Sequence, residues 1–204
     1  MKKYLIIIIA SLIGSFNAVS AETADALLKK AADAINAADG ISASFTLISG
    51  GKKVTGTLKS DGNKFALLTS TSSTWYDGKT MWTYNASGNE TTLMYPTSTE
   101  LSEANPLYIV KTYSGSFTAQ YAKTQEKGFS TVVLTPKSKR AGFQSVHVSI
   151  PDGSNYPAKI VVVPLSGQKI TISISQIKTG QKFQAATFTY PKSKYPNAEI
   201  VDLR

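Results

Sequence analysis

The chain has 204 residues, 42% of them hydrophobic, and no cysteine. This length suits one domain with a sizeable core, and the lack of cysteine excludes disulfides and thiolate metal sites. Lysine and arginine outnumber aspartate and glutamate by 22 to 13, which gives a formal net charge of +9. The lysines are scattered rather than interleaved with aromatic residues, which argues against a nucleic-acid platform. The charge favours acidic partners or anionic lipid head groups, unless it is only a solvated lysine-rich surface.

The first 21 residues have the form of a cleavable export signal. Two lysines precede an apolar run over residues 4–13, and Val19-Ser20-Ala21 has the small residues that signal peptidase prefers. The apolar run is shorter than the roughly 20 residues that span a bilayer, so a membrane anchor is the weaker alternative. We expect cleavage after Ala21 and a single mature domain over residues 22–204, with a net charge of +7 once the two lysines are removed.

The mature chain begins with a predicted helix. Over residues 23–38, Leu27, Leu28 and Ile35 recur at three- and four-residue spacings among charged residues, which is typical of an amphipathic helix. Gly40 follows as a stop signal, because glycine accepts the left-handed conformation that ends many helices. From Ile41 the apolar period changes to two, so the first strand is expected to start there.

Alternating residues between glycine-containing turns then predict an antiparallel meander. Its strands are expected at residues 41–47, 52–59, 64–70, 75–76, 80–85 and 90–95. Residues 70–74 read as a polar loop or edge. The alternation is lost over residues 100–113, where Asn105-Pro106 is a suitable start for a short helix.

Strand patterns return in the second half of the chain. They cover residues 129–135, 143–150, 158–163, 169–177 and 183–190. Ile170, Ile172 and Ile174 alternate with polar residues, which indicates a sheet with one wet and one apolar face. Ten or eleven strands form too large an antiparallel sheet to stay flat, so we expect a mainly β, α+β fold curled into a barrel or half-barrel, with a helix or two over its mouth.

The sequence offers little catalytic chemistry. His147 is the sole histidine, and Ser145 and Ser149 flank it on the polar face of its strand. Without a Gly-x-Ser-x-Gly motif or cysteines, a serine hydrolase and a zinc site are both implausible. The acidic residues of the first half do not pair across a cleft in the way that glycosidases require. We expect no enzyme activity, no cofactor and no metal.

A surplus of apolar side chains is the remaining clue. Trp82 and Tyr84 fall on one face of their strand, and Met81 and Thr83 fall on the other. Barrels of this size can keep a cavity, although the same side chains could also interdigitate as a dry core. The residues expected on the concave face, and so as cavity lining, are Phe45, Leu47, Leu58, Phe65, Leu67, Trp82, Tyr84, Leu93 and Tyr95.

Four segments of the chain have a distinctive sequence. They are Asp77-Gly78-Lys79-Thr80-Met81-Trp82-x-Tyr84-Asn85, Gly56-x-Leu58 leading to Phe65, Val133-Leu134-Thr135-Pro136-Lys137 and the closing Phe188-Thr189-Tyr190-Pro191. These segments, the first most closely, resemble motifs of the LolA-type carriers of outer-membrane lipoproteins. The resemblance implies an unclosed β-barrel with helices as a lid over an apolar cavity. It also implies a periplasmic protein that carries lipoprotein acyl chains from an inner-membrane exporter to an outer-membrane acceptor.

The lid residues that the resemblance implies are Leu27, Leu28, Ile35, Leu107 and Val110. One departure concerns the family's Lys-Arg-Pro sequence, whose arginine holds the lid shut. Residues 59–64 occupy this place and contain no arginine, and a lysine ammonium lacks the rigid five-donor fork of arginine. The family's gating mechanism therefore does not carry over.

The sequence thus predicts a monomeric periplasmic carrier that binds lipid acyl chains, most simply those of lipoproteins, and no nucleic acid. Two alternatives stay open. One is a sensor on the same fold that detects a lipid or envelope stress, and the other is a β domain with a filled core that binds proteins through its surface. A charged residue at Leu58 or Trp82 would displace cargo from a carrier but unfold a filled core.

Overall fold

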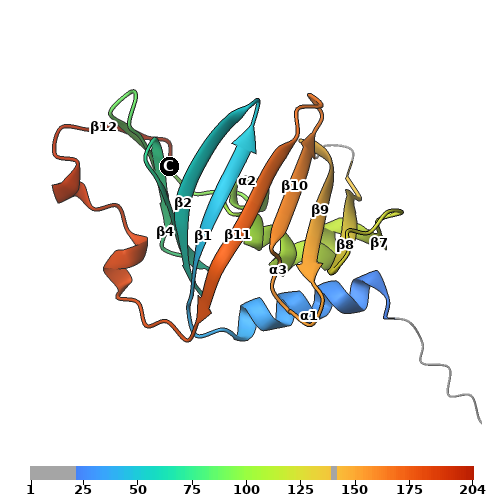
Figure 1. Cartoon of the computed structure of the whole chain (residues 1–204). Coiled ribbons are helices and arrows are strands. Elements are labelled where there is room, and N and C mark those ends of the chain that lie inside the picture. Colours follow the sequence, from blue (N-terminus) through green and yellow to red (C-terminus); the bar gives the residue numbers. More distant parts are fainter. Residues whose placement is uncertain (1–21, 139–141) are drawn as a thin grey trace, which may run out of the picture.

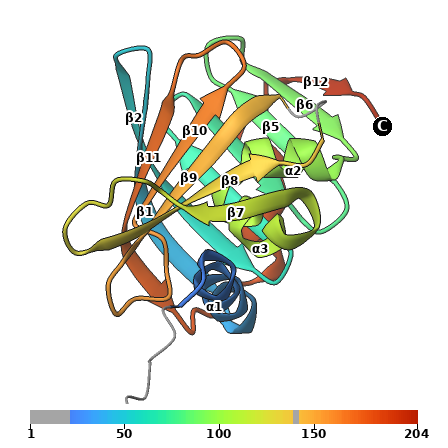
Figure 2. The same ribbon diagram turned by 90° about the vertical axis from the view of Figure 1, so that its right-hand side faces the viewer.

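A single sheet of 12 strands dominates the computed structural model, which describes residues 22–138 and 142–204. The strand order is β12-β6-β5-β4-β3-β2-β1-β11-β10-β9-β8-β7. The strands are β1 (Ile41–Ser49), β2 (Lys52–Asp61), β3 (Lys64–Thr69), β4 (Ser72–Tyr76), β5 (Met81–Asn85), β6 (Glu90–Met94), β7 (Phe117–Tyr121), β8 (Phe129–Pro136), β9 (Phe143–Pro151), β10 (Lys159–Pro164), β11 (Ile170–Thr179) and β12 (Glu199–Asp202). Figures 1 and 2 show the sheet bent around the helices α2 and α3, with α1 lying across one end. The predicted mainly β, unclosed half-barrel with short helices is confirmed.

Three α-helices cover the inner side of the sheet, α2 and α3 within its curve and α1 across one end. The first, α1 (Ala24–Ala37), starts at Thr23, whose hydroxyl accepts from the N–H of Ala26 at 3.1 Å, and it packs against α3. The short helix predicted to start at Asn105-Pro106 is α3 (Pro106–Ser116), and a second helix that the sequence prediction did not separate, α2 (Ser98–Ala104), precedes it. Asn105 separates the two helices. Its N–H donates to the carbonyl oxygen of Leu101 at the end of α2, and its side-chain oxygen accepts from the N–H of Leu107 at the start of α3.

Other boundaries differ from the sequence prediction. β4 begins at Ser72, inside the predicted polar loop, and β7 has no predicted counterpart. Residues 183–190 form no strand; they contain the 3₁₀ helix η1 (Ala185–Phe188), followed by η2 (Lys192–Lys194). The aromatic residues of this segment pack on the sheet, so their alternation reflects burial rather than strand pairing. The closing strand β12 then joins β6 in parallel, the one parallel pairing among the described strands.

Apolar layers cover both faces of the sheet. On the inner face, which α3 covers, the main core joins the three helices to β1–β5 and β7–β11. On the outer face, a smaller cluster holds the C-terminal segment against β3 and β4. This outer cluster consists of Ala66, Leu68, Trp75, Trp82, Tyr84, Phe183, Phe188, Tyr190 and Tyr195. The C-terminal segment therefore acts as a strap over one half of the sheet.

The predicted export signal, with its cleavage point at Ala21, lies outside the described residues. Within residues 22–138 and 142–204, no helix combines the length and hydropathy that a membrane-spanning helix needs.

Candidate functional site

An apolar cavity of about 350 Å³ lies between the inner face of the sheet and the helices α2 and α3. The described side chains that line it come from β1, β2, β3, β4, β9, β10 and β11 and from the helical segment on the other side. They are Ala43, Phe45, Leu47, Leu58, Leu67, Thr74, Ser102, Glu103, Ala104, Pro106, Leu107, Ile109, Phe143, Val162, Ile170, Ile172 and Ile174. Glu103 is the one charged member of this set, so the cavity suits an apolar ligand.

Strand register explains why these side chains meet. Phe45 pairs with Ile174 and Leu47 pairs with Ile172, so the alternating residues of β1 and β11 face the same side. Directly opposed side chains of neighbouring strands lie on one face of a sheet. The clean alternation of β11 therefore forms one wall of the cavity.

Gly56 makes room for the ring of Phe45. The two residues are paired across β1 and β2, and a Cβ atom at position 56 would lie 2.4 Å from Cζ of Phe45. It would also lie 2.4 Å from the carbonyl oxygen of Leu68. The missing side chain thus lets the phenyl ring lie close to β2 and shapes the cavity floor.

The burial of the lining changes along the strands. Ala43 and Ile174, at one end, are buried, whereas Leu47, Val162 and Ile170, at the other end, are only half-buried. Solvent therefore reaches the cavity from the end where β1 and β10 finish and β11 begins. We call this end the mouth.

A second, more polar groove of about 290 Å³ lies beside the cavity. Tyr108, Thr112 and Ser116 project from α3 at intervals of four residues, and α2 contributes further hydroxyls. The described lining is Ser98, Thr99, Ser102, Tyr108, Thr112, Ser116, Phe117, Pro136, Ser138 and Phe143. Ser102 and Phe143 line both the groove and the cavity, so a ligand could extend from one into the other.

Four of the nine predicted lining residues line the cavity: Phe45, Leu47, Leu58 and Leu67. Phe65 also faces inward, but it is fully buried in the main core, with its ring centroid 5.6 Å from that of Tyr76. These residues come from β1, β2 and β3, where only one face of each strand is strongly apolar, so alternation identified the inner face.

Contrary to the sequence prediction, Trp82 and Tyr84 lie on the outer face of the sheet. Both belong to the outer cluster, and the ring centroids of Tyr84 and Tyr195 are 4.1 Å apart. Met81, on the opposite face of β5, belongs to the main core. Both faces of β5 carry apolar residues, so its pattern alone does not tell which face is inside.

Leu93 and Tyr95 also lie away from the cavity. Leu93 pairs with Trp82 and so shares its outer side, where it is buried beside β12. Tyr95 is 51% exposed, with Lys79 Nζ 5.5 Å and the Arg204 guanidinium 5.8 Å from its ring centroid. The first half of the sheet thus contributes fewer aromatic residues to the cavity than the sequence suggests.

The five predicted lid residues, Leu27, Leu28, Ile35, Leu107 and Val110, are all buried in the main core. Of these, only Leu107 lines the cavity. The helices α1 and α3 are joined by a hydrogen bond of 2.9 Å, which the hydroxyl of Tyr113 donates to the carbonyl oxygen of Asp25. Ala104, Pro106 and Ile109 also roof the cavity, and the helix-start signal of Asn105-Pro106 is the feature of the sequence that points to them.

Lys111 joins the helix α3 to the sheet within residues 59–64, the segment that lacks the family's arginine. Lys111 of α3 donates from Nζ to the carbonyl oxygen of Gly62 at 2.6 Å, and Gly62 belongs to the turn between β2 and β3. Burial lowers the pKa of Lys111 from its ordinary value of 10.5. A hydrogen bond thus connects α3 with the β2–β3 hairpin, and its donor is on the helix.

The described residues contain no cluster of histidine, aspartate and glutamate that could hold a metal ion. His147 contacts Ser145, at 3.2 Å between Nε2 and Oγ, on the side of β9 opposite the buried Val146 and Val148. Its pKa is lowered by burial and then by the charge of Lys169. The cavity and the single histidine therefore lie on different sides of the sheet.

Comparison with known protein families gives a match to "Outer membrane lipoprotein carrier protein LolA" over residues 14–168. The chain belongs to the LolA family. The match ends just before β11, so the strap and β12 lie beyond it. No curated protein matches the sequence of this LolA-family chain.

Solved structures similar to this LolA-family protein have low sequence identity to it. An uncharacterized conserved protein from Thermus thermophilus is 13% identical, with a TM-score of 0.58, and the alignment covers 88% of this chain and 98% of that one. A DUF1329 family protein from Desulfovibrio piger is 10% identical, with a TM-score of 0.50 and coverage of 83% and 98%. A LolA superfamily protein from Nitrosomonas europaea is 12% identical, with a TM-score of 0.45 and coverage of 83% and 99%.

Proposed function

We propose that this protein is a periplasmic carrier that binds a lipid acyl chain in the inner cavity and moves lipoproteins from an inner-membrane exporter to an outer-membrane acceptor. The observation that supports the proposal best is the apolar cavity of about 350 Å³ in a chain of the LolA family. An export signal, expected from the sequence, would bring the protein to the compartment where such transport takes place.

The physics of the cavity suits this cargo. Burial of an acyl chain is worth about 0.8 kcal/mol for each CH₂ group, so the chain leaves water strongly in favour of an apolar enclosure. The described lining is mostly aliphatic and phenyl, with the hydroxyls of Thr74 and Ser102 and the carboxylate of the exposed Glu103 as its polar side-chain groups. A charged or strongly polar ligand would lose its hydration there and gain few partners.

The volume limits the size of the cargo. Small-molecule sites measure roughly 300–1,000 Å³, so a cavity of about 350 Å³ lies at the small end. We therefore propose that one acyl chain occupies the cavity at a time. Any further chain would need the roof to move.

Two residues on opposite sides of the sheet offer a matched test. Leu47 of β1 lines the cavity and is half-buried, whereas Ser173 of β11 is exposed and faces the other side. Leu47→Glu places a carboxylate in the lining and should abolish binding of a fluorescent fatty acid. Ser173→Glu adds the same charge outside and should bind like the wild type, with both variants keeping the wild-type circular dichroism spectrum.

The cargo itself can be identified on protein purified from a bacterial periplasm. Native mass spectrometry with lipid extraction should find acylated species on the wild type and on Ser173→Glu, but not on Leu47→Glu. If the wild type carries no lipid and binds no fatty acid, the carrier proposal fails. If Leu47→Glu is unfolded, the half-buried Ile170 provides a second site for the same substitution.

A further inference from the structure

Two hairpin turns stand next to each other at the mouth of the cavity. One joins β1 to β2 through Gly50 and Gly51, and the other joins β10 to β11 over residues 165–169. The turns lie close together, since a Cβ atom at Gly50 would lie 2.3 Å from Nε2 of Gln168. We call residues 48–53 and 164–170 together the sheet-side lip.

The sheet-side lip carries exposed apolar residues. Leu165 is 62% exposed at the tip of its turn, the highest value among the large hydrophobic residues in the described part of the chain. Ile48 on the other hairpin is also exposed. Exposed apolar side chains at turn tips gain free energy by entering an apolar phase, and here they border the opening of an apolar cavity.

The charge of the lip has a single sign. Lys52, Lys53 and Lys169 are exposed, and neither segment contains an aspartate or a glutamate. Ser49 pairs with Lys52 on the same side as Leu47, so Lys52 extends the cavity-facing side of β2 beyond the mouth. Glu103, on α2, is the acidic residue of the opposite wall.

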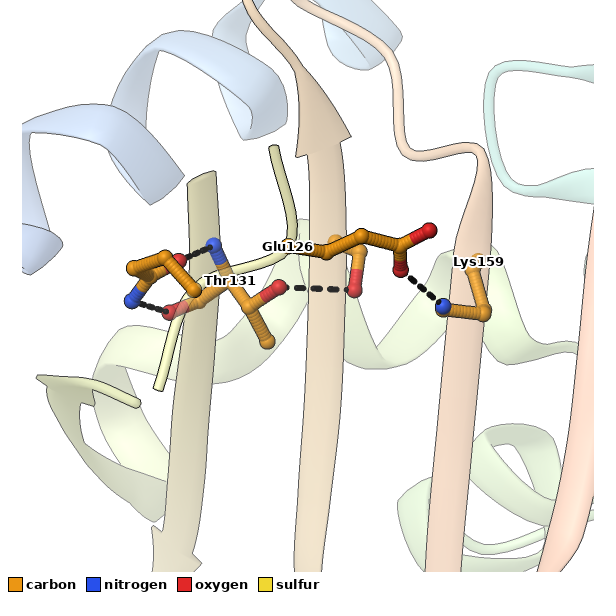
Figure 3. A network of polar contacts seen from close by, with 5 residues as sticks. Glu126, Thr131 and Lys159 are labelled. Atoms are coloured by element: carbon orange, nitrogen blue, oxygen red, sulfur yellow. Dashed lines mark hydrogen bonds and ion pairs between the residues drawn. The ribbon is translucent and has the colours of Figure 1, made fainter. Parts of the chain in front are cut away.

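The other end of the sheet is different. There, the turn between β7 and β8 contains Glu126, which accepts from Lys159 Nζ at 2.6 Å. Figure 3 shows this ion pair within a network that also includes Thr131, whose hydroxyl lies 2.9 Å from that of Ser149. This turn therefore mixes an acidic residue with its two lysines, Lys123 and Lys127, whereas the sheet-side lip contains lysines and no acidic residue.

We propose that the sheet-side lip docks on the surface of an anionic lipid bilayer, with Leu165 entering the acyl boundary and the three lysines against the head groups. In this orientation the mouth faces the membrane, so an acyl chain passes between bilayer and cavity without crossing water. Each lysine near an anionic surface contributes about 1 kcal/mol to binding, and the Leu165 side chain adds an apolar contact that salt does not screen. This membrane contact rests on the proposed carrier function, because it would serve to transfer the acyl chain between the bilayer and the cavity.

The test measures co-sedimentation with vesicles of phosphatidylglycerol and phosphatidylcholine, compared with vesicles of phosphatidylcholine alone. The wild type should bind only the anionic vesicles. Lys52→Gln/Lys53→Gln should weaken binding about thirtyfold at low salt, which corresponds to about 1 kcal/mol for each lysine. Leu165→Ser should weaken it about tenfold, at high salt as well as at low salt.

The matched control removes the same charge from a hairpin at the other end of the sheet. Lys123 and Lys127 are exposed on the turn between β7 and β8, so Lys123→Gln/Lys127→Gln should bind anionic vesicles like the wild type. Equal losses in both double variants would show that net charge, and not the lip, drives adsorption, and would overturn the proposal. Wild-type binding by the lip variants, or no vesicle binding by the wild type, would also overturn it.

A soluble fluorescent fatty acid separates this proposal from the carrier function. The lip variants should bind it like the wild type, because their substitutions lie outside the cavity lining. Normal vesicle docking without fatty-acid binding would reject the carrier proposal alone. Normal fatty-acid binding without vesicle docking would reject the membrane contact alone and favour loading from an acidic protein partner.

Discussion

Nζ of Lys111 lies 2.6 Å from the carbonyl oxygen of Gly62, 49 residues earlier in the chain. This contact joins α3, which roofs the cavity, to the turn between β2 and β3, whose strands form its floor. The charged donor is half-buried, so its replacement affects both packing and hydrogen bonding.

Lys111→Met should loosen the roof without unfolding the protein. The variant keeps the apolar stem and removes the donor, at a cost of about 1 kcal/mol for a charge-assisted hydrogen bond that is partly open to solvent. Amide hydrogen exchange should become faster in α3 and in the turn at residues 61–63, and fatty-acid release should accelerate. Lys127→Met, on an exposed distant turn, should leave both rates unchanged.

Gly56→Ala should destabilise the fold and narrow the cavity. Overpacking of a closely fitted site costs about 1–3 kcal/mol, and here the added methyl meets both the Phe45 ring and a backbone carbonyl. Thermal unfolding should shift to lower temperature, and fatty-acid affinity should fall. Gly115→Ala is the control, because a Cβ there meets nothing within 4 Å and alanine favours the helix by about 0.5–1 kcal/mol. Equal stability of the two variants would contradict the packing argument.

The sequence predicted the cavity best where one face of a strand is polar. Ile170, Ile172 and Ile174 alternate with threonine and serine, and all three line the cavity. β5 has Met81 on one side and Trp82 with Tyr84 on the other, so the pattern does not identify the inner face. The C-terminal strap covers Trp82 and Tyr84 and so determines which face of β5 is the outer one. The position of the strap depends on contacts between residues more than 100 positions apart in the chain, which no local sequence pattern encodes.

Tyr195→Ala should release the strap while the cavity stays intact. The ring of Tyr195 lies 4.1 Å from that of Tyr84 and 6.0 Å from that of Trp75, and each such aromatic pair is worth about 0.5–1.5 kcal/mol beyond burial. Limited proteolysis should become faster within residues 183–204, whereas fatty-acid binding should equal that of the wild type. Tyr121→Ala, at an exposed position, should change neither. Loss of fatty-acid binding in Tyr195→Ala would mean that the strap and the cavity form one cooperative unit.

Acid should loosen α2, which forms part of the cavity roof. The Glu100 carboxylate accepts from the N–H of Thr97 at 2.7 Å and from its hydroxyl at 2.8 Å, and these bonds lower the pKa of Glu100 from its ordinary value of 4.5. A carboxyl with a lowered folded pKa stabilises the native state above its unfolded pKa, and this contribution is lost as the pH falls through the folded value. Amide exchange in α2, corrected for the intrinsic effect of pH, should therefore rise in that acidic range. Glu100→Gln can keep the reciprocal cap without a titrating group, so its α2 exchange should no longer respond to acid in this way. The same acid response in Glu100→Gln would assign the loosening to another group.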